Sequence, residues 1–168
     1  DYAGQVNGFL SENKAIRDPL LAALACPVLP GSKDQRMELV NACLRANELR
    51  SIKRFEHYQK LAEMAGWFNE HPSGMLYVGD QFIVDLLVWY HLAWMGETVR
   101  RENLLIQQLM AKGTGFSLHD RRALVKLIGE LLSSVIDGYR ELADRGQVEL
   151  AMSPYAHPIV PLLLDMDS

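Results

Sequence analysis

The sequence predicts a mainly α-helical domain of about five helices, with one short strand near the C-terminus. Apolar residues recur at three- and four-residue spacing through most of residues 18–145, which is the period of an amphipathic helix. Apolar and polar residues then alternate over 147–152, as in a strand with one buried face. Prolines crowd the residues that follow. No helix interior tolerates that density, because proline removes an N–H donor and fixes φ.

The 168 residues are enough for one domain with its own hydrophobic core. Within residues 1–168 we expect a poorly ordered lead-in over 1–17, helices over 18–145, and a strand with a proline-rich loop over 146–168. The first helix begins at Asp18-Pro19, because Asp is a good N-cap residue and proline suits the first helical position.

A second helical pattern opens at Ser32 and continues to Ala65. A break is expected over 47–51, because Asn and Ser side chains compete with the helical backbone for hydrogen bonds. Either Gly66 or the turn residues at 71–74 stop the pattern.

Residues 80–96 are apolar on almost every side, which indicates either a buried helix or a membrane span. A span needs about 20 apolar residues. This run is shorter and contains Asp85 and His91, so we interpret it as the central buried helix. A shorter amphipathic helix follows over 101–112.

The last helix is the longest. Ser117 and Asp120 have the spacing of a capping box. One apolar stripe then continues to the end of the helix, at Leu124, Leu127, Ile128, Leu131, Leu132, Val135, Tyr139 and Leu142. At about 1.5 Å per residue this helix is roughly 40 Å long.

Composition excludes several classes of function. The net charge of −4 and the lack of a basic run argue against a nucleic-acid binder. Two cysteines make no disulfide framework, which favours a reducing, cytoplasmic setting. We predict no metal and no cofactor, because there is no glycine-rich phosphate loop and the histidines have no metal-ligand spacing. Those histidines are His57, His71, His91 and His119.

Most acidic residues are typical of solvated helix faces: Glu12, Glu38, Glu48, Glu56, Glu63, Glu102 and Glu130. Four aromatic residues, Trp67, Phe82, Trp89 and Trp94, suit either a sugar groove or, more often at this spacing, the core. The segment after the predicted strand places Tyr155 and His157 on a stiff loop. Such a loop either builds a binding site or packs on the helices as a tail.

The C-terminal segment resembles the second conserved region of glycoside hydrolase family 57, which acts on α-glucans. The matching residues are 146–150, Pro154 and Tyr155, and 157–163. Ala156 departs from the pattern, because the family usually carries a second tyrosine there. Asp18-Pro19-Leu20-Leu21 and the run Leu87–Trp94 resemble two helical segments of the same family.

The resemblance implies that the chain is a helical subdomain of a larger enzyme with a distorted barrel of seven β/α repeats. The enzyme would be an α-amylase or 4-α-glucanotransferase that retains configuration by double displacement. The family's first conserved region is not found, and its two catalytic carboxylates lie on strands further downstream. We therefore expect a fragment that holds no catalytic residue and is inactive alone.

By the same resemblance, His157 and Tyr155 bind the α-glucan or malto-oligosaccharide, with Glu149 beside them. Glu149 has an alternative role as a charge that protects a strand edge. If the predicted strand at 147–152 lacks its barrel neighbours, it either stays disordered or pairs with another copy of the chain. No membrane partner is expected. One rival is a non-enzymatic helical interaction module, and another is a family relative that has lost its activity.

Overall fold

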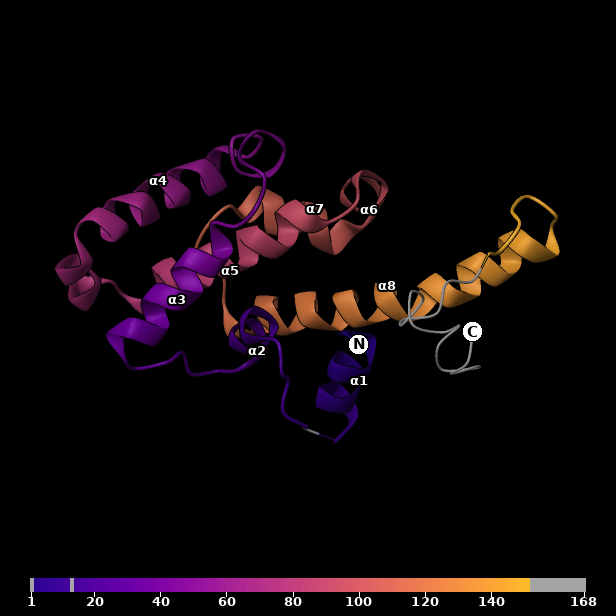
Figure 1. Cartoon of the computed structure of the whole chain (residues 1–168), viewed down its shortest axis with the longest axis horizontal. Helices are drawn as coiled ribbons and strands as arrows, with labels where there is room; N and C mark the ends of the chain where they lie inside the picture. The colour runs from indigo at the N-terminus through magenta and orange to yellow at the C-terminus, as the bar shows by residue number, and fades with distance from the viewer. Residues whose placement is uncertain (1, 13, 152–168) are drawn as a thin grey trace, which may run out of the picture. The chain divides into compact units, whose positions relative to one another are not determined.

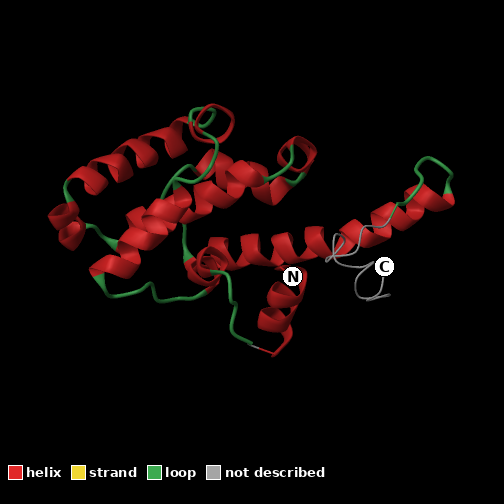
Figure 2. Cartoon of the chain, in the orientation of Figure 1, coloured by secondary structure: helices red, strands yellow, loops and turns green. Residues whose placement is uncertain are grey.

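The computed structural model describes residues 2–12 and 14–151, and over that part the chain is mainly helical (Figures 1 and 2). The chain divides after Leu132 into two units. In chain order the helices are α1 (Tyr2–Glu12), α2 (Pro19–Ala25), α3 (Lys33–Cys43), the π-helix η1 (Glu48–Ile52), α4 (Glu56–Glu70), the 3-10 helix η2 (Pro72–Tyr77), α5 (Asp80–Trp94), α6 (Glu97–Glu102), α7 (Leu104–Lys112) and α8 (Leu118–Asp144).

The short C-terminal strand was predicted wrongly: no strand occurs among the described residues, 147–151 included. Helix α8 instead ends in a Schellman motif at Gly146, whose φ of 66° favours glycine. The Gln147 N–H donates to the Leu142 carbonyl oxygen at 3.0 Å, and the Gly146 N–H donates to that of Ala143 at 2.9 Å. Alternation alone makes no strand without a second strand to bond, and the described residues supply none. Pairing of this segment with another copy stays a prediction.

The N-terminal segment is more ordered than expected, because Tyr2–Glu12 forms helix α1. Val6 of α1 is fully buried, and a Cβ placed on Gly129 of α8 would lie only 2.5 Å from its side chain. The Gln5 side-chain oxygen accepts hydrogen bonds from the backbone N–H groups of Arg17 and Asp18. The estimate of about five helices was also too low, since helices as short as α6 show no clear apolar period.

Local cap chemistry sets several helix starts as predicted. The Asp18 carboxylate accepts the Leu21 N–H at 2.8 Å and begins α2. At α8, the Ser117 and Asp120 side chains each accept the other residue's backbone N–H, which makes the capping box. The break expected over 47–51 is the π-helix η1, which begins where the Asn47 side chain accepts the Arg50 N–H.

Helix α5 is the centre of the first unit and packs against α2, α3 and α4. Leu86, Leu87, Val88 and Leu92 are fully buried, as predicted for the central helix. Each such side chain contributes about 1.5–3 kcal/mol by leaving water. Across the described residues, no helix combines the length and apolarity that a membrane crossing needs.

Trp89 of α5 contacts both the loop between α7 and α8 and helix α4. The Trp89 indole N–H donates to the Gly113 carbonyl oxygen at 2.6 Å, and the Trp89 ring stacks on His57. Gly113 has φ 76°, and a Cβ there would lie 2.6 Å from the His57 ring. Glycine is therefore required at this point by both backbone conformation and space.

Candidate glycan-binding site

The predicted site residues fall at and beyond the end of α8. Glu149 is exposed, in a segment without regular structure that follows the Schellman motif. Tyr155 and His157 lie outside the described residues, so their relation to Glu149 stays a prediction. The glycine that opens this segment has a clear local role, because Gly146 turns the chain out of the helix.

Among the described residues of the first unit, Asp85 is the buried carboxylate, with only 5% of its surface exposed. It accepts hydrogen bonds from the backbone N–H groups of Gly115 and Phe116, at 3.0 and 3.1 Å, and from the Gln81 side chain at 2.7 Å. A carboxylate held by three donors is a structural tie between α5 and the loop before α8. It has no second carboxylate among these partners for acid–base chemistry.

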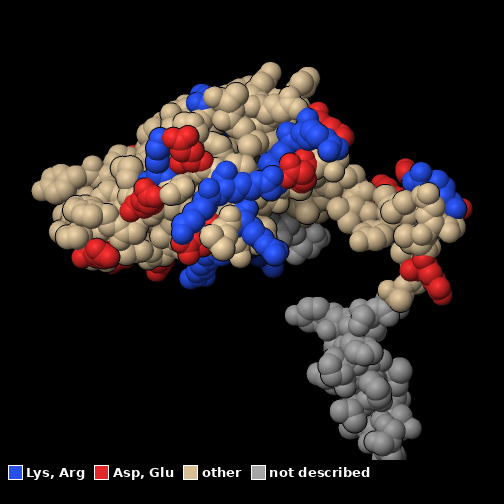
Figure 3. Space-filling model, turned by 90° about the horizontal axis from the view of Figure 1, so that it is seen from above, with Lys and Arg blue, Asp and Glu red and all other residues tan. Residues whose placement is uncertain are grey.

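A retaining glycosidase needs two carboxyl groups about 5 Å apart, one of them with a raised pKa. That both groups lie outside this chain stays a prediction. The seven glutamates predicted to be solvated are all exposed, as expected. Hydrogen bonds from Lys53 and Lys60 lower the pKa values of Glu48 and Glu56, and those from Arg100 and Arg54 lower that of Glu97. These shifts oppose a general-acid role at neutral pH. On the face in Figure 3, basic and acidic groups lie side by side.

Three of the grooves on the described part of the first unit differ in volume and lining. The largest, about 810 Å³ between α2 and α3, has one acidic residue, Glu38, in its wall. The other two measure about 360 and 230 Å³ and have no acidic residue in their walls. None of the three therefore brings two carboxylates together.

The four predicted aromatic residues divide between core and surface. Trp89 is core, with 3% of its surface exposed, and Phe82 is partly buried. Trp67 and Trp94 are 51% and 62% exposed, so the preference for core was wrong for these two. Helical spacing carried a signal for Trp67, because it shares a face of α4 with Glu63 and Glu70, at i−4 and i+3.

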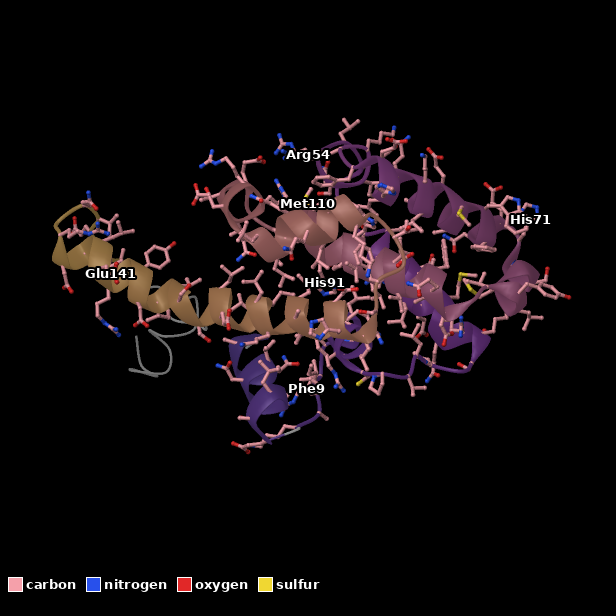
Figure 4. All side chains as sticks on the ribbon, turned by 180° about the vertical axis from the view of Figure 1, so that it is seen from behind. Phe9, Arg54, His71, His91, Met110 and Glu141 are labelled. Carbon is pink, nitrogen blue, oxygen red and sulfur yellow. The ribbon has the colours of Figure 1, made fainter. Side chains whose placement is uncertain are left out.

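Helix α5 presents His91 and Trp94 to the smallest groove, whose opposite wall includes Ile128 and Leu131 of α8 (Figure 4). The His91 Nδ1–H donates to the Leu87 carbonyl oxygen at 2.7 Å. Burial lowers the pKa of His91, although that hydrogen bond and the nearby Asp18 carboxylate oppose the shift. Since a carbonyl only accepts, Nδ1 carries the proton and Nε2 of the neutral ring is an acceptor. Asp18 and His91 belong to the two helical segments with family resemblance, and they lie close enough to interact.

Comparison with known proteins identifies the class. Residues 36–168 match the family model described as Glycosyl hydrolase family 57, which is most of the chain. The protein belongs to glycoside hydrolase family 57, and its substrate class is a glycan. The searches of curated proteins and of solved structures returned no match. The matched range contains α5, α8 and the segment with Glu149, Tyr155 and His157. Asp18-Pro19-Leu20-Leu21 precedes it, so the resemblance of that run stays a prediction.

Proposed function

We propose that the chain is the helical part of a family 57 enzyme that cleaves or transfers α-glucans, as an α-amylase or 4-α-glucanotransferase. The observation that carries the proposal is the family match, which includes the Gly146–Leu163 segment. The enzyme works in the cytoplasm, a reducing setting that suits the free, exposed thiol of Cys26.

In the proposed mechanism a carboxylate attacks the anomeric carbon while a carboxylic acid protonates the departing glycosidic oxygen. Water, or a sugar hydroxyl in transfer, then displaces the carboxylate and restores the original configuration. Both carboxyl groups lie outside this chain in our proposal. The exposure and ion pairing of the described glutamates, and the backbone ties of Asp85, support that assignment.

The chain's own contribution is to bind sugar. Tyr155 packs its ring on the apolar face of a pyranose, and His157 exchanges hydrogen bonds with sugar hydroxyls. Glu149 lies in the same segment and accepts hydroxyl hydrogen bonds. The Schellman motif at Gly146 favours this role, because it gives the segment a defined point of departure from α8.

The test is His157→Ala in the complete polypeptide, measured on maltoheptaose. If His157 contacts the sugar, His157→Ala raises KM or lowers kcat/KM at least tenfold. The matched control, His119→Ala at an exposed histidine of a helix, has no effect on either constant. Product anomers followed by NMR should retain the α configuration. Equal activity of the two variants, or a β product, would contradict the proposal.

A second candidate, a helical interaction module, is favoured by one observation. In the second unit, helix α8 exposes an apolar stripe at Val135 (47%), Ile136 (66%) and Tyr139 (54%). Exposed stripes of this kind mark interaction surfaces. Ile136→Asp should abolish partner binding if the module is the function. It should leave glucan cleavage intact if the stripe has no role in catalysis.

A further inference from the structure

A second groove lies between α4, η2 and the start of α5. Its volume is about 360 Å³, within the range of small-molecule sites (roughly 300–1,000 Å³). The wall is almost wholly aromatic or apolar, with Met64, Trp67, Phe68, Tyr77 and Phe82. Trp67 is 51% exposed and Tyr77 is 88% exposed. Two large aromatic rings are therefore left in water at the mouth of one groove.

The indole of Trp67 is fixed by its neighbours. His71 stacks on it with ring centroids 4.4 Å apart and an angle of 15°, and Phe68 meets it edge-on at 5.3 Å. A Cβ on Gly74 of η2 would lie 2.7 Å from the Trp67 ring, so the glycine lets the 3-10 turn close against it. A ring held this way loses little conformational entropy when a ligand packs on it.

His71 lies at the end of α4 in Figure 4 and stacks on the Trp67 ring, next to the groove but not among the residues that line it. Its Nδ1–H donates to the Trp67 carbonyl oxygen at 3.1 Å. A carbonyl only accepts, so Nε2 of the neutral ring is an acceptor. The imidazole is exposed, which makes Nε2 available to a hydroxyl group.

We propose that this groove binds an α-linked glucan chain as an accessory site, in addition to the sugar contacts proposed for Tyr155 and His157. Flat apolar rings beside a hydroxyl acceptor fit the two surfaces of a pyranose, whose C–H face packs on indole or phenol while its equatorial hydroxyls need hydrogen bonds. The ligand class rests on the proposed function, because the family match is to a glycan-acting enzyme.

The test measures the Kd of maltoheptaose for the 168-residue chain and its variants by isothermal titration calorimetry, and it follows the Trp67 indole N–H signal by NMR in those that keep Trp67. The expected result is a saturable shift of that signal. Trp67→Ala raises the Kd at least tenfold and Tyr77→Ala raises it several-fold. Two exposed residues outside the groove give matched controls, and Trp94→Ala and Leu76→Ala leave the Kd unchanged. Gly74→Ala keeps both aromatic rings but displaces the indole, so it also weakens binding.

Circular dichroism verifies that each variant is folded, which is expected because both aromatic targets are largely exposed. A Trp67 signal that does not respond to maltoheptaose would overturn the proposal, as would equal response to β-linked cellohexaose. This readout is independent of catalysis. If the complete polypeptide cleaves no α-glucan but the indole still responds, the proposed function fails and the accessory site stands. If cleavage occurs and the indole signal does not respond to maltoheptaose, the proposed function stands and the accessory site is refuted.

Discussion

Asp85 offers the sharpest test of how the first unit is held together, through the substitution Asp85→Asn. The two carboxylate oxygens accept three hydrogen bonds, two of them from the backbone of the loop before α8. An amide keeps one oxygen but turns an NH₂ group toward the Gly115 or Phe116 N–H. One hydrogen bond to a charged group, worth about 1.5–3 kcal/mol, is lost. The other bonds lose their charge assistance, so we expect a total loss of about 2–4 kcal/mol.

The assay is urea unfolding at pH 7, monitored by circular dichroism. The stabilities of the two proteins are compared provided that their m-values are the same. Asp137→Asn is the matched control, because Asp137 pairs with Arg140 on the exposed surface of α8. It should change stability by no more than about 1 kcal/mol. Hydrogen exchange at the Gly115 amide should accelerate in the Asp85 variant. A loss below about 1 kcal/mol with unchanged exchange would refute the reasoning from hydrogen-bond counts.

Two further changes test particular contacts. Gly113→Ala should lower the free energy of unfolding by at least about 2 kcal/mol in urea, because alanine is strained at φ 76° and its Cβ meets His57. Gly66 lies in open space within α4, so Gly66→Ala should be neutral or stabilising by up to about 1 kcal/mol. An equal loss of stability in Gly66→Ala and Gly113→Ala would contradict the account. Burial lowers the pKa of His91, so the unfolded chain takes up the proton first as pH falls. Stability should therefore decline below about pH 6.5, the ordinary histidine pKa, until the folded-state pKa is reached. His91→Gln should remove this decline in pH-dependent unfolding and His119→Gln should not. A decline unchanged in His91→Gln would contradict it.

The parts of the fold that the sequence predicted are those set by local chemistry. Asp18 before Pro19 and the pair Ser117 and Asp120 begin helices through bonds within a few residues. The apolar run of α5 was recognisable as buried, because no face of that helix is polar enough for water.

The missed features depend on contacts between distant residues. Helix α1 is ordered by packing Val6 against Gly129, and the loop before α8 is held by Asp85, about 30 residues earlier. The strand was predicted wrongly because alternation over 147–150 forms a strand only where a second strand is present to pair with it. A single sequence does not show whether such a second strand is present, or which distant residues will pack together.

The family was predicted correctly, whereas the site residues Glu149, Tyr155 and His157 stay predictions. The resemblance of the C-terminal segment led to the family, and the family match supports that resemblance. The exposed Trp67 was not predicted, although Glu63 and Glu70 on the same helical face pointed to solvent. The groove itself depends on η2 closing against α4 at Gly74, which no local pattern indicates.

The most direct measurement is the release of reducing sugar from starch and from short malto-oligosaccharides by the 168-residue chain, beside a family 57 polypeptide that contains it. The account predicts cleavage by the longer polypeptide and none by the chain alone. Cleavage by the chain alone would mean that a working carboxyl pair lies within residues 1–168, and the proposal that both groups lie elsewhere would be wrong.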